Sequence, residues 1–337
     1  MIQREVLLDV KGLKKYFPIE KGFLRRVTGN IKAVDDVSFF INEGETLGLV
    51  GESGCGKTTL GRCVLRAIEP TEGKIFLRLK DKELTDISTL DRQSIRSVRR
   101  YMQMIFQDPY SSLDPRMSIL DIIGEPLSAN NVAKGKKLED RVRELAKIVG
   151  LETKYLKRYP HAFSGGQRQR IGIARALALN PKFIVADEAV SALDVSIKAQ
   201  ILNLLQDLQE QFHLTYLFVS HDLGVIEHIS DRVAVMYVGK MVELAETEEL
   251  FNTPKHPYTE ALLSANPQLD PDLKMSRIVL PGEVANPANP PSGCYFHPRC
   301  KYAKSLCVER APEWEQVAPE HFTACHFARE LRLSGVV

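Results

Sequence analysis

The sequence lacks the features that mark membrane-spanning, secreted or nucleic-acid-binding proteins. No apolar run approaches the ~20 residues that a spanning helix needs, and internal repeats, long coiled coils and low-complexity tracts are absent. Lys plus Arg (45) and Asp plus Glu (43) nearly balance, so the net charge of +2 gives no argument for nucleic acid or for an anionic membrane surface. The N-terminal stretch MIQREVLLDVKG has acidic residues where a secretory signal is apolar. We therefore expect a cytoplasmic protein that reaches a membrane only through a partner.

What is present is typical of a globular protein with about two domains. The 337 residues are 44% hydrophobic and 26% charged. Residues 1–50 read as strands, residues 88–160 as mostly helical, and strands alternate with helices from residue 181. This alternation predicts an α/β protein with a largely parallel sheet wrapped by helices. From about residue 266 proline-rich stretches such as NPQLDPDLK resist regular structure.

A glycine-rich stretch, LVGESGCGKTTLGR, begins at Leu49. Gly51, Gly56, Lys57 and Thr58 fit the pattern G-x-x-x-x-G-K-[ST], between a short apolar segment and a helical pattern. Glycines let successive N–H groups face one concavity, and the following helix directs its positive end there. Lys57 adds a charge for the β- and γ-phosphates, and the Thr58 hydroxyl is placed to bind Mg²⁺. The loop predicts a nucleoside triphosphate site.

A second stretch, FIVADEAVSALD, supplies carboxylates for the same site. Four apolar residues predict a buried strand that ends at Asp187 and Glu188. A carboxylate at the end of a strand beside a phosphate loop can hold the Mg²⁺ shell, which fits Asp187. Glu188 is the candidate general base for an attacking water.

The stretch HAFSGGQRQRIGIARALALNP predicts a helix with Ser164 as its N-cap and an N-terminus that can bind anions. Ser-Gly-Gly-Gln stands about 23 residues before the Asp-Glu pair. This combination resembles the signature motif of the ABC (ATP-binding cassette) ATPases. Arg168 and Arg170 are expected to position the helix and not to touch phosphate.

Further positions match this family one at a time. Gln107, in MIFQDP, matches the glutamine that reaches Mg²⁺ and water, and whose loop senses the membrane partner. Asp194, in SALD, matches the loop that contacts the opposite subunit, and His221, in FVSHD, matches the switch histidine at the γ-phosphate. Phe17, with Tyr16 as the close second, matches the aromatic residue that stacks on adenine.

The resemblance implies ATP and Mg²⁺ as cofactors, with Thr58, Gln107 and Asp187 around Mg²⁺. Glu188, His221 and Gln107 are the catalytic candidates. The predicted nucleotide contacts are Phe17, Tyr16, Gly51, Ser53, Gly54, Cys55, Gly56, Lys57, Thr58, Thr59, Asp187, Ser164, Gly165, Gly166, Gln167 and Asp194. The family usually has proline after the catalytic glutamate, where this chain has Ala189; we expect hydrolysis to be retained.

The resemblance also implies the architecture. It is an ABC-type P-loop ATPase core with an antiparallel β subdomain, a helical insert at about 88–165 and a cysteine-bearing C-terminal extension. The predicted boundaries are 1–265 for the nucleotide-binding domain and 266–337 for the extension. Two such domains would pair head to tail, with each ATP held between one phosphate loop and the partner's signature helix.

The C-terminal part points to a branch of the family. KHPYTEALLSANP, PGEVANPANPPSGCYFHPRC and the earlier QDPYSSLDPRMS resemble the ATP-binding subunits of oligopeptide and dipeptide permeases. These subunits bind two membrane-spanning permease proteins at the cytoplasmic face, beside an identical or sister ATPase, and an extracytoplasmic peptide-binding protein feeds them. Alternatives are an importer of nickel or another small solute, and an ABC ATPase of DNA repair or translation. Intact Glu188 and His221 argue against a non-catalytic regulatory cassette.

The six cysteines are unevenly distributed. Cys55 and Cys63 read as small packed residues, whereas four lie within the last 44 residues, with gaps of five, six and seventeen: Cys294, Cys300, Cys307 and Cys325. Such clustering in a reducing compartment favours metal over disulfides. Members of the permease branch hold a [4Fe–4S] cluster at such cysteines, which we expect here. Zinc, with His297 and His326 as further ligands, and free thiols are the alternatives.

Overall fold

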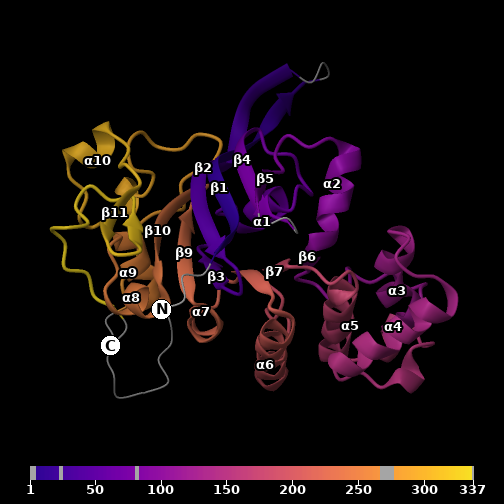
Figure 1. The fold of residues 1–337 in the computed structure, drawn as a ribbon. Coiled ribbons are helices and arrows are strands. Elements are labelled where there is room, and N and C mark those ends of the chain that lie inside the picture. Colours follow the sequence, from indigo (N-terminus) through magenta and orange to yellow (C-terminus); the bar gives the residue numbers. More distant parts are fainter. Residues whose placement is uncertain (1–4, 23–25, 80–82, 266–276, 336–337) are drawn as a thin grey trace.

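The computed structural model of the protein describes residues 5–22, 26–79, 83–265 and 277–335. Two sheets form its centre, a group of helices lies at one end, and the C-terminal segment, residues 277–335, lies at the other (Figure 1). No helix in these described ranges is long and apolar enough to cross a bilayer. The sequence stretch NPQLDPDLK, expected to be irregular, lies outside them.

The smaller sheet is antiparallel and has the strand order β2-β1-β4-β5. Its strands are β1 (Val6–Lys21), β2 (Arg26–Asn42), β4 (Glu72–Arg78) and β5 (Leu84–Asp86). The strands thus include residues 20–21 and 26–30 of the polar stretch EKGFLRRVTGN, which the sequence pattern predicts as a separator between two strands. Phe17 pairs with Ile31 and Lys21 with Arg26, so β1 and β2 form a long hairpin that extends beyond the sheet (Figure 1).

The larger sheet has the order β11-β12-β10-β9-β3-β8-β7-β6 in the described part of the chain. Parallel pairing joins β9 (Arg232–Tyr237), β3 (Thr46–Val50), β8 (Thr215–Val219), β7 (Phe183–Asp187) and β6 (Met102–Ile105). Every residue of β3, β7 and β8 is buried, as predicted for parallel strands covered on both faces. Strand β6 lies within the range that the sequence predicted to be mostly helical.

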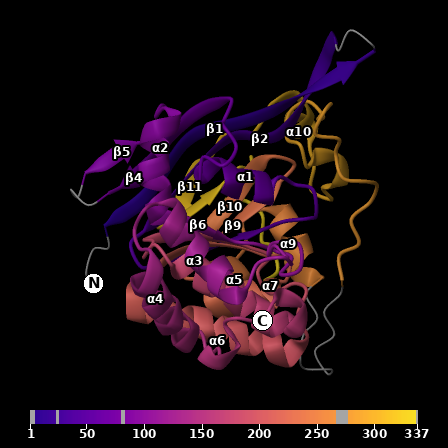
Figure 2. The ribbon, with the colours of Figure 1, turned by 90° about the vertical axis from the view of Figure 1, so that its right-hand side faces the viewer.

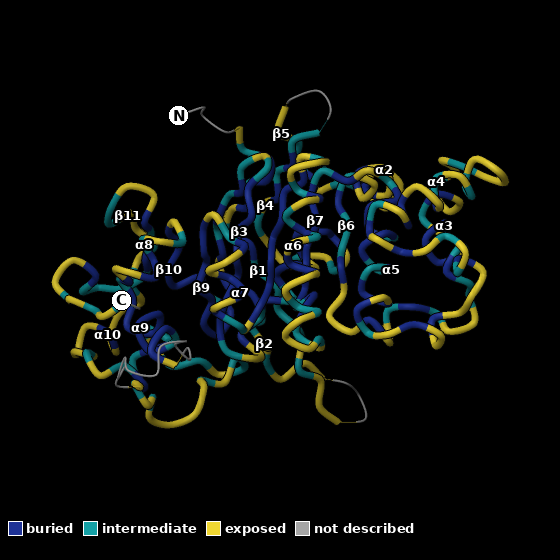
Figure 3. The backbone as a smooth tube through the Cα atoms, turned by 90° about the horizontal axis from the view of Figure 1, so that it is seen from below, coloured by how far each residue is buried: buried dark blue, intermediate teal, exposed yellow. Residues whose placement is uncertain are grey.

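Helices cover both faces of the larger sheet. Helix α1 (Lys57–Val64) contacts strands of both sheets, whereas α6 (Val195–Phe212) and α7 (Leu223–Ile229) lie on the opposite face (Figures 1 and 2). The helical insert consists of α3 (Ile119–Ala129), α4 (Gly135–Ile148) and α5 (Gly165–Leu177). It lies beyond β6, and its buried residues belong to the same apolar cluster as residues of the larger sheet (Figure 3). The remaining helices are α2 (Arg92–Val98), α8 (Thr247–Asn252), α9 (Pro257–Ser264) and α10 (Ser305–Glu309), and the 3-10 turns are η1 (Arg99–Tyr101), η2 (Thr153–Tyr155), η3 (Pro160–Ala162) and η4 (His297–Arg299).

The C-terminal segment is continuous with the larger sheet. Strand β12 (His321–Thr323) pairs with β10 (Lys240–Glu246) through Glu243–Thr323 and Leu244–Phe322, and β11 (Glu315–Ala318) pairs with β12. Phe296 is only 2% exposed and belongs to the same buried cluster as the strands. The described part of the predicted extension therefore shares a buried apolar cluster with the preceding residues.

Candidate nucleotide-binding site

The phosphate loop, residues 51–58, connects β3 to α1. Three of its glycines have positive φ: +151° at Gly51, +80° at Gly54 and +108° at Gly56. A Cβ at Gly51 would lie 2.1 Å from the Met236 carbonyl oxygen, and one at Gly56 would lie 2.0 Å from the Ala33 carbonyl oxygen. Any side chain at these two positions would displace backbone. Glycine is therefore required there, which explains the pattern from which the loop was predicted.

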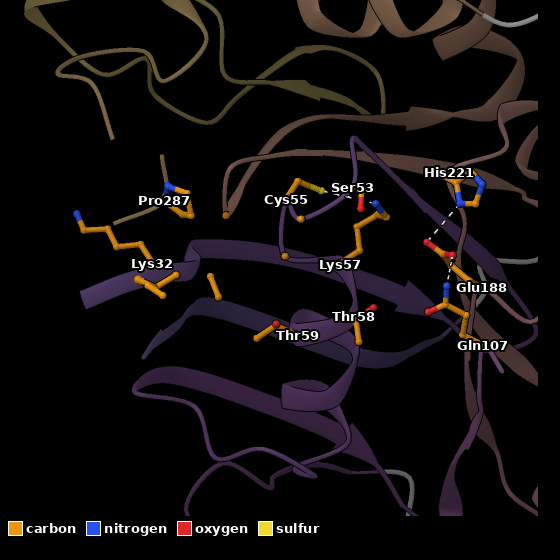
Figure 4. Close-up of a pocket in the computed structure, with 15 residues that line it drawn as sticks. Lys32, Ser53, Cys55, Lys57, Thr58, Thr59, Gln107, Glu188, His221 and Pro287 are labelled. Atoms are coloured by element: carbon orange, nitrogen blue, oxygen red, sulfur yellow. Dashed lines mark hydrogen bonds and ion pairs between the residues drawn. The ribbon is translucent and has the colours of Figure 1, made fainter. Parts of the chain in front are cut away.

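A cavity of about 450 Å³ lies over this loop. Residues of the loop line its centre, and Gln107, Glu188 and His221 lie at one end (Figure 4). The Lys57 ammonium is buried in the loop, where it donates hydrogen bonds to the carbonyl oxygens of Gly51 (2.7 Å) and Glu52 (3.2 Å). A fixed cation in a glycine-rich loop at the start of a helix suits a polyphosphate.

Thr58 and Asp187 lie side by side, as the magnesium prediction requires. The Thr58 hydroxyl donates to a carboxylate oxygen of Asp187 at 2.9 Å. Asp187 ends β7 and is 2% exposed; burial raises its pKa, and the hydrogen bond from Thr58 opposes that rise. Magnesium binds one or two protein oxygens together with substrate phosphates and water, so this pair fits a magnesium ion held against a triphosphate.

Glu188 is held between two polar side chains. Gln107 donates from Nε2 to Glu188 Oε2 at 2.7 Å, and His221 Nδ1 lies 3.3 Å from Glu188 Oε1 (Figure 4). The backbone of Glu188 has a positive φ of 47°, which non-glycine residues seldom adopt. The Glu188 N–H donates to the Val219 carbonyl oxygen of β8, and this bond helps hold the strained residue. The carboxylate consequently has a fixed direction at the end of the cavity.

Ser164 is the N-cap of α5, as predicted. Its hydroxyl accepts a hydrogen bond from the Gln167 N–H, and the Gln167 side chain accepts one from the Ser164 N–H, which completes a capping box. Arg168 donates to the Pro160 carbonyl oxygen and Arg170 to the Val149 carbonyl oxygen, so both hold the helix as expected. Among the described residues that line the cavity, none comes from the predicted signature contacts Ser164, Gly165, Gly166, Gln167 and Asp194.

Comparison with known proteins places these features in a family. Residues 34–191 match the sequence model of the ABC transporter family, and residues 242–307 match that of the oligopeptide/dipeptide transporter C-terminal region. The oligopeptide transport ATP-binding protein AppF of Bacillus subtilis (strain 168) is 55% identical over 326 residues, which cover 96% of this chain and 98% of the relative. The chain belongs to the oligopeptide/dipeptide branch of the ABC transporter family.

Other relatives of this ABC protein are similar over their whole length. The putative oligopeptide transport ATP-binding protein YkfD of B. subtilis is 50% identical, with 97% of each chain covered. A putative peptide import ATP-binding protein of Brucella ovis is 51% identical, with 95% of this chain and 97% of the relative covered. Among solved structures, the dimeric ATP-binding cassette MJ0796 bound to ADP and Pi has a TM-score of 0.61 at 28% identity. That likeness covers 72% of this chain and 99% of MJ0796, and shows an ABC ATPase fold.

Several pocket residues of this ABC protein were not predicted from the sequence. Ile31 and Lys32 of β2 and Pro287 of the C-terminal segment line the cavity. Lys32 and Pro287 lie at the end away from Glu188 (Figure 4). The Lys32 N–H donates to the Pro287 carbonyl oxygen at 3.0 Å, which joins the segment to the pocket wall. No motif in the sequence indicates this contact, because it joins residues more than 250 positions apart.

Tyr16 and Phe17, the predicted adenine contacts, are not among the described residues that line the cavity. The Tyr16 hydroxyl donates to Asp35, to which Tyr295 also donates at 2.9 Å, and Lys15 lies over the Phe17 ring. Adenine stacking at these two positions stays a prediction.

The four C-terminal cysteines line one small cavity of about 20 Å³ together with His297 and His326, and all are free thiols. Burial raises the pKa of Cys294 to about 11 and that of Cys325 to about 12. No group of three or more His, Cys, Asp or Glu side chains in the described ranges is arranged to hold a metal ion. The thiols are therefore gathered but not arranged as ligands, and the structure does not support the iron–sulfur prediction or its zinc alternative. Cys55 and Cys63 are buried, as predicted.

Proposed function

We propose that this ABC ATPase hydrolyses ATP to drive a membrane importer of peptides. The observation that carries the proposal is one cavity that brings together the phosphate loop, the Thr58–Asp187 pair and the Gln107–Glu188–His221 group, in a chain 55% identical to an oligopeptide transport ATP-binding protein. The names of the relatives favour peptides over nickel or another small solute as cargo.

The chemistry follows from the positions of the side chains. The loop and Lys57 bind the β- and γ-phosphates, and Glu188 accepts a proton from the water that attacks the γ-phosphorus. His221 contacts the Glu188 carboxylate through Nδ1, and the resemblance to the family implies that this histidine also contacts the γ-phosphate. Magnesium held by Thr58, Asp187 and Gln107 would neutralise charge that develops on the phosphate oxygens.

A second cassette completes this proposed site. Because the signature residues of this chain do not line its own cavity, a head-to-tail partner would supply Ser164, Gly165, Gly166, Gln167 and Asp194. The bacterial ABC transporter cassette MJ0796, a relative of known structure, has been solved as a dimer. ATP would close such a pair because its γ-phosphate contacts both halves, and hydrolysis would let it reopen.

The remaining partners follow from membership of the branch. Two membrane-spanning permease subunits would bind the ATPase pair at the cytoplasmic face of the membrane, with this chain as a peripheral subunit beside an identical or sister ATPase. An extracytoplasmic peptide-binding protein would deliver cargo. The proposal includes no nucleic-acid partner. The net charge of the chain is only +2, whereas nucleic-acid-binding domains are typically strongly basic.

Reconstitution tests the proposal. The chain is assembled with its permease subunits in proteoliposomes, and ATPase activity is measured with and without a peptide-loaded binding protein. We expect stimulation by the loaded binding protein and uptake of labelled peptide. Stimulation only by a nickel-loaded binding protein would show that the cargo is nickel and not peptide. ATPase activity that responds to duplex DNA or ribosomes in the absence of permease subunits would contradict the proposal.

The [4Fe–4S] cluster stays a prediction from the resemblance to the permease branch. Four free thiols line the cysteine cavity, but they are not arranged as metal ligands. Protein purified without oxygen is analysed for iron, sulfide and zinc. We expect about four iron and four sulfide per chain, and stoichiometric zinc without sulfide would contradict the cluster.

A further inference from the structure

Glu52, the second residue of the phosphate loop, is held by the C-terminal segment. Arg299 donates from both terminal nitrogens, to Glu52 Oε2 at 2.8 Å and to Oε1 at 3.1 Å. The Arg299 side chain is only 9% exposed, whereas surface ion pairs are open to water. Two parallel charge-assisted hydrogen bonds fix both the distance and the direction of a carboxylate.

The backbone of Glu52 is held as well. Its N–H donates to the Tyr258 hydroxyl of α9 at 2.8 Å. Tyr258 packs against Tyr237 of β9 and Phe296 of the C-terminal segment, with ring centroids 4.7–5.3 Å apart in this group. The side chain and the backbone of Glu52 are thus both fixed by groups outside the loop.

Arg299 lies in a short 3-10 turn that is held in place by a buried residue. It is the last residue of η4, and its N–H donates to the carbonyl oxygen of Phe296 at 3.0 Å. Phe296 is buried in the aromatic group just described. The guanidinium therefore has little freedom to move away from Glu52.

A negative charge at Glu52 would repel a polyphosphate bound by the loop, and Arg299 neutralises this charge. Glu52 lies between Gly51 and Ser53, directly before residues 53–59, which line the cavity, and is not itself among the described lining residues. An unpaired carboxylate there would repel that ligand and would free the first turn of the loop. The ion pair with Arg299 removes both effects.

We infer that Arg299 is a positioning residue for ATP binding, which acts through Glu52 by fixing the start of the phosphate loop and cancelling its negative charge. The nucleotide site of this chain is in that sense completed from the C-terminal segment, 247 residues along the chain. The inference rests on the proposed use of the cavity for ATP.

Binding of ATP and magnesium is measured calorimetrically on the isolated chain, in a Glu188→Gln background that prevents turnover. Failure of this background chain to bind ATP would contradict the proposed site itself. Arg299→Gln should weaken binding by about tenfold or more, because it leaves a charged partner unpaired. The loss should shrink as salt is added, since the repulsion is screened.

Two further variants separate a positioning role from a structural one. Glu52→Gln together with Arg299→Gln should recover most of the affinity, because no unpaired charge remains. Lys301→Gln is the matched control: Lys301 stands two residues away in the same segment but pairs with Glu260 of α9 at 3.3 Å, and its loss should leave affinity unchanged.

Melting temperatures and circular dichroism are recorded for every variant. If Arg299→Gln does not fold, Arg299→Lys replaces it, because lysine keeps the charge but not the paired geometry; weaker binding at an unchanged melting temperature is then expected. Unchanged affinity in the folded Arg299 variant, a double variant no better than the single one, or an equal loss in Lys301→Gln would each overturn the inference.

Discussion

At the scale of single residues, the site depends on side chains that are held before a ligand arrives. Glu188 has a backbone conformation that non-glycine residues rarely adopt, and its carboxylate is contacted by Gln107 and His221. Thr58 and Asp187 are likewise hydrogen-bonded to each other. Fixed polar groups need little reorganisation when charge develops during a reaction, which favours catalysis.

Glu188→Gln should nearly abolish turnover and leave ATP binding intact. The amide preserves the size of the side chain but cannot accept a proton from water, so we expect kcat to fall by at least about 100-fold. Steady-state phosphate release and ATP titration measure the two quantities. Turnover at the wild-type rate would exclude Glu188 as the base. Asp207→Asn on the surface helix α6 is the control and should change neither.

The motif residues could be predicted from the sequence because they form short local patterns. Gly51, Gly54 and Gly56 have positive φ within one loop, and Ser164 caps the helix that follows it. Glu52, Arg299 and Pro287 could not be predicted in the same way. Their roles come from contacts between distant segments, and no local pattern of residues encodes such a contact.

At the scale of elements, two contacts attach the C-terminal segment to the rest of the protein: a strand pairing and a packed aromatic ring. Strand β12 extends the larger sheet through β10, and Phe296 inserts into the aromatic group with Tyr237 and Tyr258. The strand supplies backbone hydrogen bonds, whereas the phenyl ring supplies buried apolar area. The position of Arg299 depends on the packing of Phe296, because the Arg299 N–H donates to the Phe296 carbonyl oxygen in the same turn.

Phe296→Ala should lower the free energy of unfolding by about 3–5 kcal/mol, because it leaves a cavity beside the rings of Tyr237 and Tyr258. Urea unfolding followed by circular dichroism measures this loss. Val308→Ala, at a site that is 44% exposed in the same segment, is the control and should stay within about 0.5 kcal/mol of the wild type. A loss below about 1 kcal/mol at Phe296 would show that the strand alone attaches the segment.

Elements were predictable where hydrophobic pattern and burial agree. Strands β7 and β8 read as continuous apolar runs and are fully buried. The far part of the β1–β2 hairpin is polar because it extends beyond the sheet, so its sequence resembles a loop. Strand β6 is only four residues long and follows directly after charged helical residues, so its hydrophobic pattern is too short to be recognised as a strand in the sequence.

At the scale of the whole molecule, the two halves of the predicted ATP site are separated. The phosphate loop lies near the centre of the molecule, whereas the start of α5 belongs to the helical insert at one end (Figure 1). In the described part of the chain, the signature residues do not line the cavity over the phosphate loop. The proposed symmetric head-to-tail pair would bring the cavity of each chain against the signature helix of the other.

The Glu188→Gln chain should form a dimer when ATP and magnesium are added, because the trapped triphosphate contacts both halves. Light scattering after size-exclusion chromatography measures the mass. Ser164→Asp should prevent this dimer: aspartate still caps the helix but places a negative charge against the γ-phosphate. Ser164→Thr keeps a neutral cap and is the control.

A Ser164→Asp chain that dimerises as well as its Ser164→Thr counterpart would contradict the sandwich. If neither chain dimerises alone, the pairing would have to involve a sister ATPase, and the same two substitutions are then compared in that mixture.

The pairing of Arg299 with Glu52 has a consequence for biosynthesis. A ribosome makes the phosphate loop long before it makes the arginine that steadies it, and at about 5–20 residues per second the interval is on the order of tens of seconds. During that time the nascent chain has every glycine and lysine of the loop but not its counter-charge. The nascent chain would thus bind ATP tightly only near the end of translation. Tight binding would have to wait until the C-terminal segment with Arg299 has left the ribosome and packed against the loop.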